Sequence, residues 1–217
     1  MGPDRQVERE WMVTHQIAAR GVRDPQVLAA MRAVPREAFV PAELAEAAFD
    51  DGPLPIGDDQ TISQPYIVAL MVEALGLRGG ERVLEVGTGS GYAAAVLGRI
   101  AAEVHTVERI DALARTAATR LAALGCANIQ VHTADGSLGW PAMAPYDAIV
   151  VAAAAPAVPA ALTAQLRDGA RLVMPVGRRA GHQELCRITR RATQGDTIEW
   201  LADVLFVPLL GAQGWPR

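Results

Sequence analysis

The stretch RVLEVGTGSGYAAAVL, residues 82–97, decides the fold. Its first five residues contain Val83, Leu84 and Val86, as expected for a strand, and an alanine-rich run with helical character follows the turn Gly87–Gly91. Three glycines in that turn let the backbone bend sharply and approach a ligand closely. The stretch therefore predicts a strand, a glycine-rich turn and a helix start, at the place where open α/β sheets bind nucleotides.

Strands and helices alternate beyond this stretch. The predicted strands are 82–86, 104–107, 129–133, 146–152 and 170–175, separated in part by helices at 91–101, 110–124 and 159–166. This alternation predicts an α/β fold with a mostly parallel sheet and helices on both faces. Two further strands, 184–191 and 197–207, have no helix between them, which predicts an antiparallel hairpin at the sheet edge.

The first sixty residues are predicted to form helices followed by a loop. A first helix places Val7, Trp11, Thr14 and Ile17 on one face, and Gly21 can end it. Further helices are predicted after Asp24-Pro25 and at 42–49, before a turn-rich loop at 50–60 and a helix at 63–75. We divide the chain into an N-terminal helical extension with its loop, residues 1–60, and a core, residues 61–217, in one compact domain.

Composition excludes several classes of protein. The 217 residues carry a net charge of −4 without a basic stripe, which argues against a nucleic-acid partner. The chain has no lysine, so Schiff-base and P-loop chemistry are excluded. Two distant cysteines predict no metal site. The charged first eleven residues lack the apolar core of a signal peptide, and no apolar run is long enough to span a membrane. We expect a cytoplasmic monomer without a membrane partner.

Three acidic residues lie at or just after the ends of successive predicted strands and point to the ligand. A dinucleotide site, as in a nicotinamide oxidoreductase, requires glycine at the sixth position from Gly87, and this chain has Tyr92 there. Glu85 suits a cationic sulfonium and ammonium, Glu108 suits ribose hydroxyls, and Asp135 can accept from an adenine amino group. The pattern favours S-adenosylmethionine as the cofactor.

The segment TISQP, residues 61–65, precedes the strand of the glycine turn. Thr61 and Gln64 match a capping box, and Ser63 can itself cap a helix that has Pro65 in its first turn. The segment can therefore be a helix start and nothing more. Exposed hydroxyls at a helix N-terminus also suit an anion, and this second interpretation places an anionic ligand near the cofactor.

Nearly the whole chain resembles the protein-L-isoaspartate O-methyltransferases. The combination of PLPIG, QTISQP and FVPL is more specific than the GTGSG turn, which indicates only a methyltransferase. One difference is Asp59, where family members commonly have glycine. The matching runs are VPREAFVP (34–41), DGPLPIGDDQTISQPYIVALM (51–71), VLEVGTGSGYAAAVL (83–97), ADGSLGWPAMAPYDAIVVAAA (134–154), GARLVMPVG (169–177) and FVPLLGAQGW (206–215).

The resemblance implies a Rossmann-like class I methyltransferase fold and methyl transfer from S-adenosylmethionine to the α-carboxylate of L-isoaspartyl residues in damaged proteins and peptides. It implies that Ser63 orients this carboxylate as the active-site serine, and that the methyl ester then cyclises to a succinimide. The implied substrate-binding residues are Thr61, Ile62, Gln64, Pro65, Phe206, Val207 and Pro208. With the three acids, the cofactor-binding residues are Thr61, Ser63, Gln64, Glu85, Gly87, Thr88, Gly89, Ser90, Gly91, Glu108, Arg109, Asp135 and Gly136.

Two alternatives stay open on the same residues. A related S-adenosylmethionine-dependent O-methyltransferase can act on a small molecule or a biosynthetic peptide, and Asp59 is the only feature that favours it. A binding module that has lost activity keeps the same fold, although the glycine turn, the acids and Ser63 argue against it. No histidine is expected to act as a base, because a carboxylate nucleophile is already ionised at neutral pH.

Overall fold

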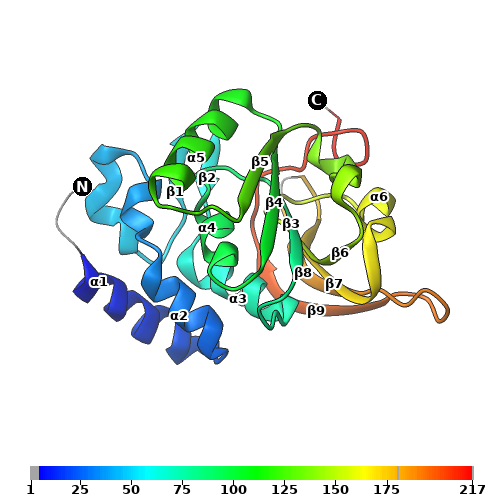
Figure 1. The fold of residues 1–217 in the computed structure, drawn as a ribbon, viewed down its shortest axis with the longest axis horizontal. Coiled ribbons are helices and arrows are strands. Elements are labelled where there is room, and N and C mark those ends of the chain that lie inside the picture. Colours follow the sequence, from blue (N-terminus) through cyan, green and yellow to red (C-terminus); the bar gives the residue numbers. More distant parts are fainter. Residues whose placement is uncertain (1–4, 180, 217) are drawn as a thin grey trace.

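A seven-stranded sheet runs through the middle of the molecule in the computed structural model, which describes residues 5–179 and 181–216 (Figure 1). The strand order is β5-β4-β3-β6-β7-β8-β9, in which β3 to β7 are parallel and β8 and β9 are antiparallel. The predicted mostly parallel sheet with an antiparallel edge hairpin is confirmed. Its strands are β3 (Arg82–Val86), β4 (Glu103–Glu108), β5 (Ile129–Thr133), β6 (Tyr146–Val151), β7 (Leu166–Gly177), β8 (Gln183–Thr189) and β9 (Thr197–Val204).

Both faces of the sheet are covered, because alternate residues of each strand point to opposite sides. Val83 and Val150 join one apolar cluster with the helices α2 to α5, whereas Leu84 and Ile149 join a second cluster with α6. Among the described residues, no helix is both long and apolar enough to cross a membrane. These elements are α2 (Pro25–Ala33), α3 (Pro65–Leu75), α4 (Tyr92–Gly98), α5 (Asp111–Ala123), α6 (Ala160–Ala164), and the 3-10 turns η5 (Gly136–Leu138) and η6 (Pro141–Met143).

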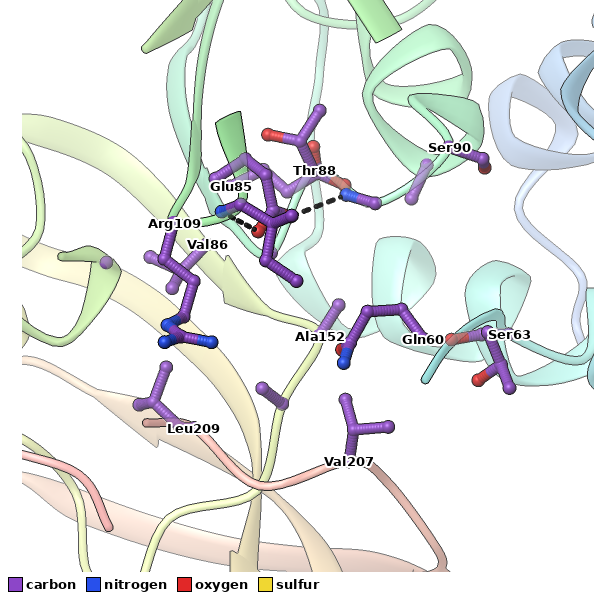
Figure 2. Close-up of a pocket in the computed structure, with 18 of the residues that line it drawn as sticks. Gln60, Ser63, Glu85, Val86, Thr88, Ser90, Arg109, Ala152, Val207 and Leu209 are labelled. Carbon is purple, nitrogen blue, oxygen red and sulfur yellow. Dashed lines mark hydrogen bonds between the residues drawn. The ribbon is translucent and has the colours of Figure 1, made fainter. Parts of the chain in front are cut away.

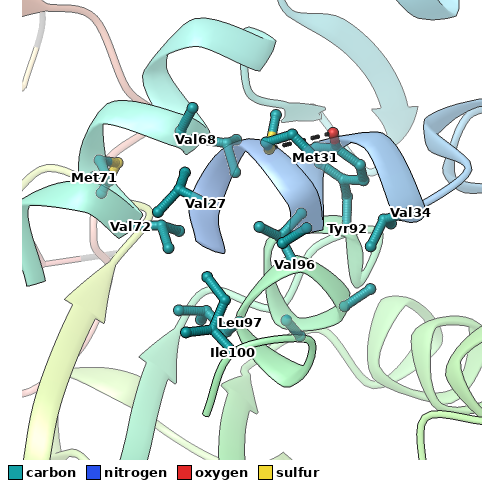
Figure 3. Packing of buried hydrophobic residues seen from close by; sticks show 14 of the residues in the cluster. Val27, Met31, Val34, Val68, Met71, Val72, Tyr92, Val96, Leu97 and Ile100 are labelled. Carbon is teal, nitrogen blue, oxygen red and sulfur yellow. Dashed lines mark hydrogen bonds between the residues drawn. The ribbon is translucent and has the colours of Figure 1, made fainter. Parts of the chain in front are cut away.

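The first cluster ties the N-terminal helices to the core. Figure 3 shows Met31 of α2 and Val68 of α3 packed around Tyr92, the first residue of α4. The Tyr92 hydroxyl lies 3.7 Å from the Met31 sulfur, and the ring of Phe39 meets that of Tyr92 edge to face. Tyr92 therefore connects the extension to the helix that follows the glycine turn.

The N-terminal helices differ from the prediction in their buried face. Val7 and Trp11 are 84% and 54% exposed, whereas Met12, Val13 and Ile17 are fully buried. The buried residues along these two helical segments are Arg9, Met12, Val13, Gln16 and Ile17, which form a different face from the predicted one. The predicted face was therefore wrong. The elements here are α1 (Gln6–Trp11), η1 (Met12–Ile17), η2 (Ala18–Arg20), η3 (Arg36–Phe39) and η4 (Ala42–Phe49); residues 1–4, part of the stretch read as lacking a signal peptide, lie outside the described residues.

The loop predicted at 50–60 contains a small hairpin. Strands β1 (Leu54–Gly57) and β2 (Gln60–Ile62) pair antiparallel around the two turn residues Asp58 and Asp59. These two residues have φ angles of +52° and +57°, as a type I′ turn requires. A Cβ at Gly89 would lie 3.3 Å from the Ile56 side chain, so the hairpin packs against the glycine turn.

Replacing Asp59 by glycine is expected to stabilise the protein. The left-handed conformation strains a residue with a side chain, although aspartate tolerates it better than most. Part of the gain is offset because glycine also makes the unfolded chain more flexible. We expect a net gain of about 0.5 kcal/mol, or a melting temperature higher by roughly 1–2 °C. Asp59→Ala is the control for loss of the carboxylate, and a glycine variant no more stable than the alanine variant would contradict the expectation.

Candidate active site

A cavity lies at the carboxyl ends of β3 and β4, where the strand order changes direction between β3 and β6. Such switch points are where open α/β sheets bind ligands. Figure 2 shows Glu85 and Thr88 on one side of the cavity and Val207 and Leu209 on the other, with Ser63 at the right. Of the predicted residues, those that line the cavity are Thr61, Ile62, Ser63, Glu85, Gly87, Thr88, Gly89, Ser90, Glu108, Arg109, Gly136, Val207 and Pro208.

Five predicted residues do not line this cavity: Gln64, Pro65, Gly91, Asp135 and Phe206. Leu209, the last residue of the FVPL segment that the resemblance placed at the peptide groove, lines the cavity as expected. The other lining residues were not among the predicted site residues. These additional residues are Gln60, Val68, Val86, Tyr92, Ala93, Val107, Ile110, Ala152, Ala153 and Leu210.

The third glycine of the turn serves helix packing. Gly91 has φ +91° at the N-terminus of α4, and a Cβ there would lie 3.3 Å from Ala117 and 3.5 Å from Leu121 of α5. A side chain at this position would be strained and crowded at once. Gly91 therefore lets α5 approach the turn closely, which explains why it lies behind the cavity wall.

Glu85 is almost completely buried at the end of β3 (1% exposed). Its Oε2 accepts a hydrogen bond of 2.5 Å from Thr106, whose hydroxyl lies 2.6 Å from that of Thr88. Its Oε1 has no hydrogen-bond partner among the described residues. Burial raises the pKa of Glu85 to about 8, and the nearby charge of Glu108 adds to this rise, whereas the Thr106 hydrogen bond opposes it. A buried carboxylate oxygen without a partner is costly, so a cationic ligand would be stabilised here.

Glu108 ends β4 beside the glycine turn. Its Oε2 accepts from the backbone N–H of Gly89 and its Oε1 from that of Ile110, both at 2.9 Å. Each carboxylate oxygen can accept more than one hydrogen bond. The backbone thus fixes the side chain while lone pairs remain for ligand hydroxyls.

Asp135 fastens the C-terminal segment. Its Oδ1 accepts from the backbone and hydroxyl of Ser137, at 2.9 and 2.7 Å, and its Oδ2 accepts from the Ala212 N–H at 2.8 Å. Burial raises the pKa of Asp135, but these bonds and the charge of Arg109 outweigh it, so the pKa is lowered overall. A Cβ at Gly211 would lie 2.0 Å from Oδ1, so glycine is needed for this approach. Asp135 therefore has a structural role beside its predicted cofactor contact.

We expect Asp135→Ala to weaken binding of S-adenosylmethionine by about tenfold, corresponding to one lost hydrogen bond. The change removes an acceptor for the adenine amino group and also releases the segment at Ala212. Isothermal titration calorimetry measures the affinity. Asp135→Asn is the matched control, because it keeps the size and one acceptor oxygen. Undiminished affinity in the alanine variant would remove Asp135 from the cofactor site.

The TISQP segment does not cap its helix through a side chain. Helix α3 begins at Pro65, and within the described part of the chain no side chain caps its first turn. The capping-box interpretation of Thr61 and Gln64, and the one with Ser63 as the cap, were wrong. Gln64 instead donates to the Asp51 carboxylate at 2.8 Å. The hydroxyls of Thr61 and Ser63 are therefore not used by the helix, and both residues line the cavity.

The segment after β9 forms the cavity wall that faces Glu85 and Thr88. It is held in place by hydrogen bonds to Gln183 and to Ala154. The buried side chain of Gln183 accepts from the Phe206 N–H at 2.7 Å and donates to the Phe206 carbonyl at 3.2 Å. Ala154 then pairs with the Val207 carbonyl and the Leu209 N–H, each at 2.8 Å. Gln183 uses both hydrogen-bonding groups of the Phe206 backbone, and the first residue of this segment that lines the cavity is Val207. Only the tertiary structure reveals this role of Gln183.

The sheet order and an acid-lined cavity after a glycine turn define a class I methyltransferase. A family model described as protein-L-isoaspartate(D-aspartate) O-methyltransferase matches residues 7–214. The chain belongs to this family. Protein-L-isoaspartate O-methyltransferase 1 of Rhodopseudomonas palustris is 64% identical over 208 residues, which are 96% of this chain and 85% of that protein. Protein-L-isoaspartate O-methyltransferase 2 of Pelobacter propionicus is 57% identical over 212 residues, which are 98% and 94% of the two chains.

Solved structures agree with the fold. A protein-L-isoaspartate O-methyltransferase superimposes with a TM-score of 0.84 at 28% identity, covering 96% of this chain and 67% of that one. A β-aspartate methyltransferase from Plasmodium falciparum, in complex with S-adenosyl-L-homocysteine, gives a TM-score of 0.77 at 24% identity, covering 92% and 96%. The confirmed expectation is the class I methyltransferase fold with its N-terminal helical extension.

Proposed function

We propose that this protein transfers a methyl group from S-adenosylmethionine to the α-carboxylate of L-isoaspartyl residues in damaged proteins and peptides, and thereby repairs them. One observation carries the proposal in the structure. One cavity holds, on one wall, the buried Glu85 side chain, whose Oε1 has no hydrogen-bond partner among the described residues, and, on another wall, Ser63, whose hydroxyl does not cap α3. The first suits a cation and the second an anion, which are the two charges that this reaction brings together.

The residues around the glycine turn fit the cofactor. We propose that Glu85 receives the cationic methionine end, that Glu108 receives the ribose hydroxyls, and that Gly136 and Arg109 lie beside the adenine. When bound, S-adenosylmethionine supplies the methyl group from its sulfonium. The cluster Glu85–Thr106–Thr88 fixes the Glu85 side chain before any ligand arrives, because each side chain is buried and hydrogen-bonded to the next.

The protein's own contribution to the reaction is positioning. The nucleophile is an oxygen of the substrate α-carboxylate, which is ionised at neutral pH, so no general base is needed. Ser63 donates a hydrogen bond to this carboxylate and orients it, with Thr61 beside it. The segment Val207–Leu210 lines the side where the peptide chain enters. Holding two reactants in line is a large part of catalysis in such bimolecular reactions.

The extension takes part in the substrate side of the cavity. We propose that residues 1–60 and 61–217 work as one compact domain, because Arg36 bonds the Ser63 carbonyl and Asp51 bonds Gln64. Cytoplasmic location and a monomeric state stay predictions, which cell fractionation and light scattering test.

The test is methyl transfer from labelled S-adenosylmethionine to a peptide that contains one isoaspartyl residue. The same peptide with a normal aspartyl residue is the control. We expect methylation of the isoaspartyl peptide only. Cofactor binding without methylation of either peptide would overturn the proposal and favour a small-molecule or biosynthetic-peptide substrate.

A further inference from the structure

Arg36 is a fully buried cation next to the proposed substrate site. Its side chain is 0% exposed. Nε donates to the Ala48 carbonyl and Nη2 to the Ser63 carbonyl, both at 2.8 Å. Within residues 5–179 and 181–216, Nη1 has no hydrogen-bond partner, and no carboxylate forms an ion pair with Arg36. The partners of the guanidinium are thus neutral groups.

Burial of such a cation is unfavourable unless something offsets it. Two carbonyl dipoles and the face of the Tyr92 ring, 4.8 Å from the guanidinium carbon, supply part of the stabilisation. Burial lowers the pKa of Arg36, yet arginine stays charged in proteins. A positive charge without a carboxylate partner among the described residues therefore lies directly behind Ser63 and Tyr92, two residues that line the cavity.

The charged residues that line the cavity all lie on the side of the cavity proposed for the cofactor. These residues are Glu85, Glu108 and Arg109, and all three lie at the ends of β3 and β4. The two carboxylates suit a cationic cofactor but repel a substrate carboxylate. The wall formed by Thr61–Ser63 has no charged side chain of its own among the described lining residues. Arg36 is the cation behind that wall.

We propose that Arg36 is a positioning residue for the anionic substrate. It fixes the backbone of Ser63 through the carbonyl, and its charge, which pairs with no carboxylate among the described residues, favours a substrate carboxylate beside the Ser63 hydroxyl. The inference rests on the proposed function, since it assigns the selectivity for a negatively charged group at the same site. Arg36 belongs to the N-terminal extension and touches neither ligand. It is nevertheless one of the residues that determine which substrate is accepted.

Three substitutions separate charge from packing. Arg36→Gln removes the charge and keeps an N–H donor for the Ser63 carbonyl, Arg36→Met removes both, and Arg36→Lys keeps the charge. The probes are an isoaspartyl peptide as substrate and the same peptide with an α-carboxamide as a neutral competitive inhibitor. S-adenosylhomocysteine binding, measured by calorimetry, reports on the fold of the cavity.

We expect Arg36→Gln and Arg36→Met to raise KM for the carboxylate peptide about tenfold, as expected for one lost interaction with a charge. The inhibition constant of the carboxamide and the affinity for S-adenosylhomocysteine should change less than about threefold. Arg36→Lys should recover most of the loss in KM, which a purely structural role would not require. The Lys and Gln variants alone decide the matter if the Met variant does not fold.

Equal losses for the carboxylate and the carboxamide peptides would overturn the role of the charge. So would a Lys variant no better than the Gln variant. If the proposed function itself is wrong, the wild-type protein will not methylate the isoaspartyl peptide at all. The two failures can therefore be distinguished.

Discussion

Glu85→Gln is expected to weaken binding of S-adenosylmethionine by about a hundredfold. Hydrogen bonds to a charged group are worth about 1.5–3 kcal/mol, and each 1.4 kcal/mol corresponds to a factor of ten. Glutamine preserves the size of the side chain and an acceptor for Thr106, so the change removes mainly the negative charge. Isothermal titration calorimetry at pH 8 measures the difference. A variant that binds as tightly as the wild type would exclude Glu85 from the cofactor site.

The loss should depend on pH. Burial raises the pKa of Glu85 to about 8 in the free protein, so the side chain is largely protonated at pH 6. A bound cation favours the carboxylate, and binding at pH 6–8 must therefore release a proton. We expect the affinity of the wild type, relative to Glu85→Gln, to rise between pH 6 and 8. The amino group of the cofactor titrates in both proteins, and the ratio of affinities cancels its contribution.

The stability of the free wild-type protein, relative to Glu85→Gln, should fall as the pH rises, whereas its relative affinity for the cofactor rises. The pKa of Glu85 is raised from its ordinary value of 4.5 to about 8, so between these values the folded protein holds a proton that the unfolded chain has lost. This contribution to the free energy of unfolding is fully present below pH 4.5 and is lost as the pH rises to 8. Urea denaturation should show Glu85→Gln gaining stability relative to the wild type between pH 5 and 8. A constant difference would contradict the raised pKa.

Ser63→Ala is expected to lower kcat for an isoaspartyl peptide by about ten- to hundredfold, from the loss of one hydrogen bond to a charged group. Affinity for S-adenosylhomocysteine should change little, because Glu85 and Glu108 stand on the other wall. Stability should also change little, because the hydroxyl does not cap α3 and Arg36 bonds the backbone carbonyl.

Steady-state kinetics with the isoaspartyl peptide and with its normal aspartyl counterpart measure the effect. Ser63→Thr is the control because it keeps a hydroxyl. Recovery of turnover in the threonine variant would assign the effect to the hydroxyl group. Unchanged turnover in Ser63→Ala would remove Ser63 from the site, and a parallel loss of cofactor affinity would mean that the substitution disturbs the whole cavity.

Local patterns in the sequence determined the strands and the order of the elements. The predicted strands at 82–86 and 129–133 coincide with β3 and β5, and Asp24 caps α2 through the N–H groups of Gln26 and Val27. Such features depend on neighbours within a few residues, as hydrophobic periodicity, caps and turn glycines do. The same reasoning placed the glycine turn and its acids at the ends of strands that lie side by side.

Tertiary structure alone decided the remaining parts of the site. The hydrogen bond from the Ala212 N–H to Asp135 and the hydrogen bond from the Phe206 N–H to Gln183 both join segments that are distant in the sequence. A buried polar side chain must find its partner wherever the fold brings one, and sequence spacing does not encode which segment that is. The sequence thus determined the sheet and the residues of the glycine turn. Folding decided that Arg36, from the extension, lies behind Ser63 without a carboxylate partner among the described residues.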